Sequence, residues 1–375
     1  MAKLGDIATY INGYAFKPQD WSDEGIPIIR IQDLTGNSYQ ANRYNGEYAS
    51  KYEVNDGDVL ISWSASLGVY IWHGEKAVLN QHIFKVVFDK ERISKDFFVH
   101  QVGLILENAA SDAHGATMKH LTKPVFDALP FYLPPYEKQC EIAEVLDKVT
   151  SLISLRKQQL AKLDELVKAR FVEMFGDPVS NPKHWKTAFL LDIGYCKNGM
   201  NFHKGDSGVE IHCLGVGDFK NRTMIQNVED LPFVSLNELP DPEYLLRDND
   251  IIFVRSNGNK ELVGRCLAIY PGSIPVTYSG FCIRYRLTST NIDTPYLLQV
   301  LKTDSIRKKM TGRGANIQNL NQQTLSQLLV PIPPLSLQNE FAAFVERVDQ
   351  QKQTVQQSLE KLELMKKALM QEYFG

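Results

Sequence analysis

The eight residues Pro134-Pro135-Tyr136-Glu137-Lys138-Gln139-Cys140-Glu141 return 199 positions later as Pro333-Pro334-Leu335-Ser336-Leu337-Gln338-Asn339-Glu340. The similarity continues without a gap to Glu173-Met174-Phe175-Gly176 in the first copy and to Glu372-Tyr373-Phe374-Gly375 in the second. About 15 positions are identical between 134–176 and 333–375. Two copies of so long a unit are too few for a solenoid. The sequence therefore predicts a duplicated pair of units with approximate internal two-fold symmetry.

The similarity also extends upstream, more weakly. Leu4-Gly5-Asp6-Ile7 with Gly13 resembles Leu190-Leu191-Asp192-Ile193 with Gly199, and Gly57-Asp58-Val59-Leu60-Ile61-Ser62 resembles Asn249-Asp250-Ile251-Ile252-Phe253-Val254. Each unit is thus a globular head followed by a tail. This suits a length of 375 residues, because most domains contain roughly 100–200 residues. The predicted segments are a first head at 1–135, a central long helix at 136–176, a second head at 177–334 and a C-terminal long helix at 335–375.

Each tail is predicted to be one long helix. Neither contains an internal Gly or Pro, each begins after Pro-Pro, and each ends at a Gly, which suits a helix terminus. Arg156 and Arg170 interrupt the apolar stripe of the first tail, and Lys352 and Lys366 interrupt that of the second. The apolar residues recur with the 4-3 spacing of a coiled coil, at Ile142, Leu146, Val149, Ile153, Leu160 and Leu163 and at Phe341, Val345, Val348, Val355, Leu359 and Leu362.

The two tails are expected to pack on each other, because a single helix of this length is marginal in water. Internal two-fold symmetry makes that pairing antiparallel. The result would be a rigid rod that holds two binding surfaces at a fixed distance. The alternative is that each helix lies on its own head.

The heads are predicted to be mixed α/β, so that the fold class is α+β. Apolar, β-branched and aromatic residues gather in short runs between turn residues, the pattern of strands. Helices are expected near 97–107 and 296–310, while strand order is left open. The strand-like runs are 26–31, 59–63, 82–88 and 129–133 in the first head and 210–214, 250–254, 282–286 and 328–332 in the second.

Composition limits the class of protein. Apolar residues make up 43% and charged residues 23% of the chain, which is typical of a globular protein. No apolar run is long enough to span a membrane, and the N-terminus lacks the features of a signal peptide. The five cysteines are scattered without a C-x-x-C pair, which favours a reducing cytoplasm and gives no zinc site. We therefore expect a soluble cytoplasmic protein.

Charge is unevenly distributed along the chain. The net charge is −3, although nucleic-acid-binding proteins are often basic. Residues 251–320 nevertheless contain ten Lys or Arg against three Asp or Glu, whereas 228–250 contain one against seven. Such segregation suits a directed interaction surface, and an uneven solvated surface is the alternative.

Several loops combine Gly and Ser with the side chains that read base edges. Arg and Lys can pair with guanine and Asn and Gln with adenine, while Gly permits close approach of the backbone. Loops of this composition are also ordinary turns, so their recurrence in both heads carries the argument. The candidate DNA-binding residues are Trp63, Ser64, Asn80, Gln81, His82, Lys119, His120 and Lys123 in the first head and Arg255, Ser256, Asn257, Asn259, Lys260, Arg265, Arg313, Asn316, Gln318 and Asn319 in the second.

The order of these features resembles the specificity subunit of type I restriction-modification systems. The resemblance rests on Leu133-Pro134-Pro135-Tyr136-Glu137-Lys138-Gln139-Cys140-Glu141-Ile142-Ala143, on Phe175-Gly176-Asp177-Pro178 and, less specifically, on Lys119-His120-Leu121-Thr122-Lys123. It covers essentially the whole chain. The second tail departs from the fuller motif at Leu335-Ser336-Leu337-Gln338-Asn339-Glu340-Phe341, so the two docking faces are not expected to be identical.

The resemblance implies that each head is a target recognition domain that reads one half of a bipartite, asymmetric double-stranded DNA site. It implies that the helices set the spacer between the halves and dock two methyltransferase subunits, which use S-adenosylmethionine to methylate adenine N6. A restriction subunit that translocates and cleaves DNA, using ATP and Mg²⁺, would join through them. No cofactor is expected in this chain itself.

Motifs for catalysis by this chain are weak. Leu133-Pro134-Pro135-Tyr136 lacks the Asp or Asn that precedes Pro-Pro-Tyr in adenine methyltransferases, and Gly215-Val216-Gly217-Asp218 lacks the third glycine of a nucleotide loop. The carboxylates of Asp241, Asp248 and Asp250 have no Lys partner at a convincing spacing for a metal nuclease. We therefore expect a non-catalytic DNA-recognition subunit without a metal site. An autonomous nuclease or methyltransferase, and a coiled-coil scaffold with protein-binding heads, are the alternatives.

Overall fold

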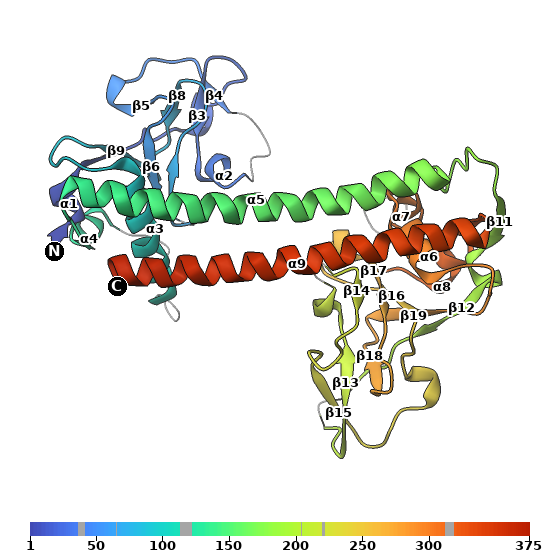
Figure 1. Cartoon of the computed structure of the whole chain (residues 1–375). Coiled ribbons are helices and arrows are strands. Elements are labelled where there is room, and N and C mark those ends of the chain that lie inside the picture. The colour runs from blue at the N-terminus through green and yellow to red at the C-terminus, as the bar shows by residue number, and fades with distance from the viewer. Residues whose placement is uncertain (37–41, 65, 113–121, 204, 220–221, 312–318) are drawn as a thin grey trace. The chain divides into compact units, whose positions relative to one another are not determined.

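The computed structural model describes residues 1–36, 42–64, 66–112, 122–203, 205–219, 222–311 and 319–375, except for the side chains of 111 and 112. The chain divides into two compact units. Unit 1 combines residues 1–158 with 356–375, and unit 2 is 159–355. Each unit therefore contains one head together with part of the central helix and part of the C-terminal helix, both of which are unbroken (Figure 1).

Unit 1 is built from short strands and helices that lead into the central helix. Three-residue 3-10 turns lie at Pro18–Asp20 and Ser50–Tyr52. The described elements are β1 (Ala2–Lys3), α1 (Leu4–Ile7), β2 (Thr9–Asn12), β3 (Ile26–Ile29), α2 (Ile31–Leu34), β4 (Arg43–Tyr44), β5 (Glu53–Val54), β6 (Val59–Ser62), β7 (Gly68–Ile71), β8 (Ala77–Leu79), β9 (Ile83–Val87), α3 (Lys95–Asp112), α4 (Lys123–Asp127), β10 (Pro130–Phe131) and the first part of α5 (Tyr136–Phe175).

Unit 2 repeats this construction with longer strands. Its 3-10 turns lie at Leu190–Asp192, Val216–Asp218, Pro242–Tyr244 and Lys260–Leu262. The described elements are β11 (Lys186–Phe189), β12 (Gly194–Asn198), β13 (Val209–Leu214), β14 (Met224–Ile225), β15 (Phe233–Leu236), β16 (Asp250–Val254), β17 (Cys266–Ile269), β18 (Val276–Tyr278), β19 (Cys282–Leu287), α6 (Thr294–Lys302), α7 (Asp304–Thr311), α8 (Gln322–Ser326), β20 (Leu329–Ile332) and the first part of α9 (Leu335–Phe374).

The two heads share one topology. The larger sheet has the order β2-β9-β6-β7 in unit 1 and β12-β19-β16-β17-β14 in unit 2. A second sheet has the order β4-β3-β8-β5 or β15-β13-β18, in which β3 and β8, like β13 and β18, run parallel. A further antiparallel pair, β1 with β10 or β11 with β20, joins the first strand of each head to the strand directly before its long helix. This pair closes each head where the helix begins.

Strand β16 lies at the centre of unit 2, and all five of its residues are buried. Ile251 and Phe253 face a core cluster that also includes Phe171 of α5 and Phe341 of α9. Ile252 and Val254 face a second cluster that includes residues of β13 and β18. Side chains alternate between the faces of a strand, so a continuous apolar run is needed where both faces are covered.

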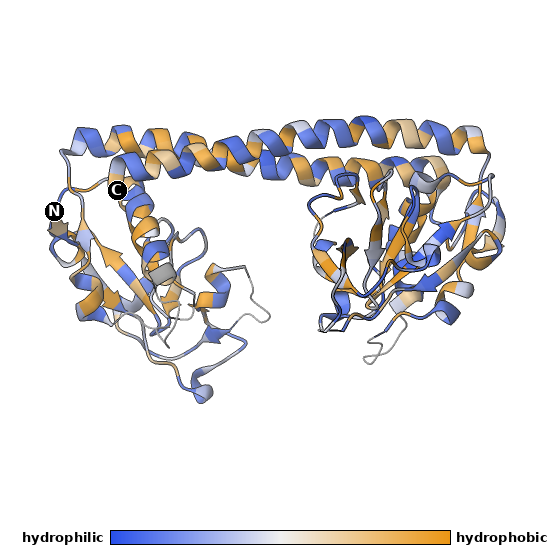
Figure 2. Cartoon of the chain, turned by 90° about the horizontal axis from the view of Figure 1, so that it is seen from below, coloured by the Kyte–Doolittle hydropathy of each residue, from blue (hydrophilic) through white to orange (hydrophobic). Residues whose placement is uncertain are grey.

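The long helices pair with each other inside each unit. In unit 1, Ile142 and Leu146 of α5 share a core with Met370 of α9, and the ring of Phe374 lies 5.4 Å from that of Phe97 in α3. In unit 2, the ring of Phe341, near the start of α9, lies 5.6 Å from that of Phe171. The start of each helix thus meets the end of the other, which confirms the predicted antiparallel coiled coil. Figure 2 shows apolar residues recurring between polar ones along both helices.

Ion pairs join the two helices and explain two of the residues that interrupt the apolar stripe. Arg170 and Lys352 keep their stems along the helix pair while their charged groups reach carboxylates of the opposite helix. The cross-helix pairs among the described residues include Lys157–Glu363 (2.9 Å) in unit 1 and Lys352–Asp164 (2.6 Å) and Arg170–Glu340 (2.9 Å) in unit 2.

The heads contain more strands than the sequence indicated. The predicted run 26–31 ends as a strand at Ile29, and Ile31 begins the short helix α2. The predicted helix 296–310 is two helices, α6 and α7, because Thr303 between them adopts an extended backbone with ψ of 144°. The strands that were not anticipated are β1, β2, β4, β5, β7, β8, β11, β12, β14, β15, β17 and β18, because most are short or carry polar residues that mask the alternation. No helix in the described ranges is both long and apolar enough to cross a membrane.

Candidate nucleic-acid interface

A tight turn links β8 to β9 in the first head. The N–H of Ile83 donates to the carbonyl of Asn80 over 3.1 Å, the bond that closes a four-residue turn. The N–H of Gln81 donates to the carbonyl of Tyr14 over 3.0 Å, which ties the turn to the segment after β2. Gln81 and His82 occupy the two central positions, and His82 is exposed. The side-chain nitrogens of these two residues lie 3.3 Å apart.

The second head carries the same turn between β18 and β19. The N–H of Cys282 donates to the carbonyl of Ser279 over 2.8 Å, and the N–H of Gly280 donates to the carbonyl of Met200 over 2.6 Å. Gly280 and Phe281 take the central positions, and 61% of Phe281 is exposed. Phe281 therefore stands where His82 stands in the first head, 199 residues earlier.

Gly13 and Gly199 explain why the turns are held so closely. A Cβ atom on Gly13 would lie 2.2 Å from the carbonyl oxygen of Asn80, and one on Gly199 would lie 2.1 Å from that of Ser279. No other residue fits this approach of two backbones without movement. The repeated glycine found in the sequence thus supports the equivalent turn in each head.

In the first head, several of the predicted residues lie around this turn. The ring of Trp63 lies 5.7 Å from the ring of His82 and is stacked 5.7 Å from Phe84. Ser64 is buried beside it and Asn80 is half-buried, its side chain accepting from the N–H of His82 over 3.4 Å. Trp63 and Asn80 therefore support the turn.

Lys123 belongs to a different part of the first head. Its ammonium group pairs with Asp127 over 2.7 Å at the start of α4 and lies 5.8 Å from the centre of the Tyr10 ring. The side chain is about half exposed, so it remains available to a phosphate. Burial of Tyr10 raises the pKa of its hydroxyl group well above the usual value, which keeps that group neutral at physiological pH.

In the second head, Arg255 and Ser256 flank the turn. Their backbone N–H groups both donate to the carbonyl of Phe281, over 2.8 and 3.3 Å, and the Arg255 guanidinium donates to the carbonyl of Gly280 over 3.3 Å. Ser256 forms a β-bridge with Asn319. The structure therefore brings Arg255, Ser256 and Asn319 together with the exposed Phe281.

Asn257, Asn259 and Lys260 form the next turn along the chain. The side chain of Asn257 accepts from the N–H of Asn259, and the side chain of Asn259 accepts from the N–H of Glu261 at the start of the 3-10 turn 260–262. Arg307 of α7 donates to the carbonyl of Glu261 over 3.1 Å and so anchors the turn. These two Asn side chains thus hold the loop in shape. Arg265 is half-buried at the end of the loop.

The basic surplus of 251–320 is smaller at the surface than in the sequence. Arg284 is fully buried, and its guanidinium donates to the carbonyl of Glu243 over 3.1 Å. Arg286 forms a two-pronged ion pair with the buried carboxylate of Asp250, with both contacts at 2.7 Å. Lys85 takes the place of Arg284 in the first head and donates to the carbonyl of Glu53. These basic residues are structural, because their charges are used to hold the segment before the central strand.

Five predicted contacts lie outside the described residues, namely Lys119, His120, Arg313, Asn316 and Gln318. They stay predictions. Phe281, in contrast, was missed by sequence reasoning, which searched for polar side chains. The signal that could have found it is its position 199 residues after His82.

The residues predicted for helix pairing all lie on the inner side of the helices. Ile142, Leu146 and Phe341 also contribute to the cores of the heads, so the ends of the helix pair are fused to those cores. Ile142, Leu146, Val149, Phe341, Val348, Val355 and Leu359 are buried, and Ile153, Leu160, Leu163, Val345 and Leu362 are half-buried.

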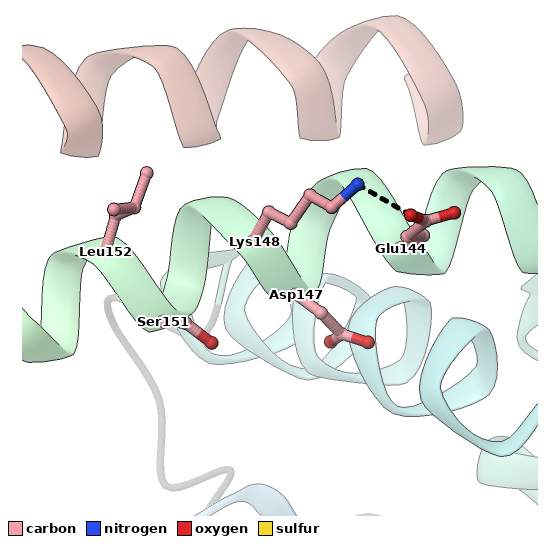
Figure 3. Close-up of a pocket in the computed structure, with 5 residues that line it drawn as sticks. All are labelled: Glu144, Asp147, Lys148, Ser151 and Leu152. Atoms are coloured by element: carbon pink, nitrogen blue, oxygen red, sulfur yellow. Dashed lines mark hydrogen bonds and ion pairs between the residues drawn. The ribbon is translucent and has the colours of Figure 1, made fainter.

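A shallow groove runs along α5 in unit 1 and is lined by Glu144, Asp147, Lys148, Ser151 and Leu152 (Figure 3). Lys148 is paired with Glu144 over 2.6 Å, and Asp147 lies 2.7 Å from Nε2 of His100 in α3. These groups are engaged with one another, and the groove lacks the depth of a small-molecule site.

Within the residues described, no cluster of three or more His, Cys, Asp or Glu side chains could hold a metal ion. The five cysteines are free. Burial raises the pKa of the Cys266 thiol to about 11 and that of Cys282 to about 12. These thiols therefore stay protonated at neutral pH, and thiolates are the reactive form.

Comparison with known proteins defines the class. The family described as the type I restriction modification DNA specificity domain matches residues 1–165 and 182–364, which is nearly the whole chain. Each matched part contains one head and most of its long helix. The chain therefore belongs to this family and is a specificity subunit of a type I restriction-modification system.

Individual relatives agree with this assignment. The chain is 23% identical to the type I restriction enzyme MjaVIII specificity subunit of Methanocaldococcus jannaschii, over 99% of this chain and 90% of that protein. It is 22% identical to the EcoKI specificity subunit of Escherichia coli, over 93% and 81%. The match to the EcoBI specificity subunit of Escherichia coli is 29% identical but covers 44% of this chain and 35% of that protein.

Solved structures share the fold. The type I restriction-modification S subunit from M. genitalium gives a TM-score of 0.56 at 15% identity, covering 100% of this chain and 95% of that one. A chain from a structural study of complex assembly and conformational transition of the type I restriction-modification system also gives 0.56, at 14% identity, covering 100% and 96%. At these identities the likeness concerns the fold alone.

Proposed function

We propose that each head reads one half of a bipartite, asymmetric DNA site and that the paired helices set the spacer between the halves. The observation that carries the proposal is one turn, built on the same backbone hydrogen bonds in both heads but bearing unlike side chains. Gln81 and His82 stand where Gly280 and Phe281 stand, and Trp63 stands where Arg255 stands. A common scaffold with different contact groups suits two half-sites of different sequence.

The helices also dock two methyltransferase subunits in this proposal, and restriction subunits join through them. Its support is the apolar surface that remains on both helices after they have paired. The exposed apolar side chains include Leu152 (45%), Leu155 (58%), Leu166 (47%) and Val172 (54%) on α5 and Leu364 (68%) and Met365 (51%) on α9. Exposed apolar side chains gathered on one element mark an interaction site.

In this proposal the partner subunits carry out the catalysis. The methyltransferase subunits bind S-adenosylmethionine and methylate adenine N6, while ATP and Mg²⁺ serve a restriction subunit where one is present. The present chain binds DNA and positions it for the partner subunits. Its side chains place the target bases before the partner active sites but transfer no group themselves.

Co-expression with the methyltransferase subunit of the same system in a host without DNA methylation tests the proposal. We expect genome-wide mapping of N6-methyladenine to give one bipartite motif with a fixed gap. A soluble complex that methylates no adenine would favour a coiled-coil scaffold with protein-binding heads instead.

Reciprocal variants assign the two halves. Arg255→Ala and Asn257→Ala are expected to weaken discrimination in one half of the motif by roughly ten- to hundredfold, since a good base contact contributes about 1–3 kcal/mol. His82→Ala serves as the matched variant and is expected to affect only the other half. Equal losses in both halves from either variant would contradict the assignment.

A separate variant tests docking. Leu155→Glu alters an exposed side chain of α5, so the thermal midpoint of unfolding should hardly change. We expect it to reduce co-purification with the methyltransferase subunit. Lys162→Glu, also on the exposed surface of α5, is the control for added negative charge. Equal retention of the partner by both variants would remove α5 around Leu155 from the docking surface.

A further inference from the structure

We infer that Phe281 is a specificity-determining residue of the second head and reads a thymine through its C5-methyl group in the major groove. The inference deepens the proposed function, on which it rests. It concerns a residue without hydrogen-bonding groups, and so differs in kind from the polar contacts predicted for this head.

The turn that presents the ring of Phe281 is rigid. The backbone of Phe281 accepts hydrogen bonds from Arg255 and Ser256, over 2.8 and 3.3 Å. Its neighbour Gly280 is tied to Met200, and Cys282 begins the buried strand β19. The turn is thus fixed on three sides, so little conformational freedom remains to be lost when DNA binds.

The fold of the second head does not require an exposed phenylalanine at this position. The ring is 61% exposed, although Cys282 and Ile283 beside it are completely buried. Phe281 belongs to no described core cluster. Its equivalent in the first head, His82, is likewise an exposed ring on the same turn. Both heads therefore expose an aromatic ring at the same position of the same turn, as expected for a contact surface that the two heads share.

The chemistry of the phenyl ring limits what it can recognise. A phenyl ring neither donates nor accepts hydrogen bonds, so it gains nothing from phosphates or from the polar edges of bases. In the major groove the thymine methyl group is the apolar feature, and Phe is one of the side chains that contact it. Arg255 lies directly beside Phe281 and can pair with an adjacent guanine. The pair thus offers one apolar and one polar contact side by side.

Removal of the methyl group from the DNA gives a direct test. The complex of this chain with its methyltransferase subunit is titrated with duplexes in which each thymine of the second half-site is replaced in turn by uracil. We expect one replacement to weaken binding by the wild-type complex about fourfold, the loss that corresponds to one apolar carbon group. The Phe281→Ala complex should bind more weakly and should respond equally to all the duplexes.

Phe233→Ala is the matched control, because Phe233 is 58% exposed in the same head but belongs to strand β15, where its ring is tilted against His212 with ring centres 4.0 Å apart. This variant should keep the wild-type response to uracil. Wild-type binding that ignores every uracil would overturn the inference, as would a Phe281→Ala complex that keeps the wild-type pattern. Tighter binding to a mismatched step, lost only in Phe281→Ala, would identify an apolar wedge and also overturn it.

The proposed function fails separately, namely when the wild-type complex shows no preference for a bipartite site. That outcome is read from the first titration, before any uracil is introduced.

Discussion

The side chain of Gln338 accepts the backbone N–H of Asp293 over 2.8 Å and donates to the carbonyl of Pro333 over 2.8 Å. Gln139 makes the same pair of bonds to Ser94 and Pro134, over 2.9 Å each. Both glutamines are buried in the first turn of a long helix. Each therefore fastens the start of its long helix to the residue directly before an earlier helix, α3 in the first head and α6 in the second, which explains the Gln of the repeated motif.

Gln338→Leu is expected to destabilise unit 2 by about 2–4 kcal/mol, because the buried backbone groups that it pairs would lose their partners. Chemical denaturation followed by circular dichroism measures the loss. Asn339→Leu, one residue further and exposed, is the control and should have little effect. A Gln338→Leu protein as stable as this control would mean that the glutamine does not fasten the helix.

Leu359→Asp should unfold the helix pair in unit 1. Leu359 is only 6% exposed, and an unpaired carboxylate at such a position costs several kcal/mol. Leu364 is 68% exposed on the same helix, so Leu364→Asp should leave the thermal midpoint nearly unchanged. Leu160→Asp, at a half-buried position of α5, should fall between the two. Similar midpoints for Leu359→Asp and Leu364→Asp would contradict the pairing.

The ion pair between Lys157 and Glu363 tests the register of the helices in unit 1. Lys157→Glu places two carboxylates together and should destabilise the unit slightly, since exposed pairs contribute about 0.2–1 kcal/mol. The second change, Glu363→Lys, should restore the loss at low salt. Lys162→Glu combined with Glu363→Lys is the control pair and should show no coupling. A double-mutant cycle in low and high salt measures the coupling, and a value of zero at low salt would argue against this register.

Lys302 gives unit 2 a dependence on pH. The residue is half-buried at the end of α6 with Asp349, Asp164 and Lys352 nearby, and burial of its amine is the main reason that its pKa lies below the usual value. The folded protein therefore holds this proton less tightly than the unfolded chain. The buried charge therefore lowers the free energy of unfolding at every pH below the pKa of Lys302 in the folded protein. This loss becomes smaller as pH rises from that pKa towards about 10.4, the usual lysine value.

Lys302→Met should consequently raise the thermal midpoint at pH 7, and its advantage should shrink as pH increases towards that usual value. Thermal unfolding of both proteins across this range measures the difference. Lys308→Met, at an exposed position of α7, controls for the loss of one positive charge. A constant advantage at every pH would show that packing, and not the charge, limits stability at this site.

The long helices could be predicted from the sequence because the signals for a helix lie close together along the chain. The absence of Gly and Pro, the 4-3 spacing and the repeated ends act within a few turns of one helix, and duplication then made the antiparallel pairing predictable. The role of Gly13 and Gly199 could be predicted only in part. The sequence showed that these glycines recur, but not that the backbone of a turn lies against each of them.

The equivalent turns of the two heads could be recognised only in the tertiary structure. The turn 279–282 is held by hydrogen bonds to Met200 and Arg255, which are distant in sequence, and a single sequence carries no record of such contacts. The same holds for Arg284 and Arg286, which belong to the basic surplus of 251–320 in the sequence but are engaged by the carbonyl of Glu243 and the carboxylate of Asp250 in the structure. The sequence by itself thus determined the duplicated heads and paired helices, because periodicity is local. Only the tertiary structure decided which charges are structural and which ring is presented, because burial depends on what the rest of the chain places nearby.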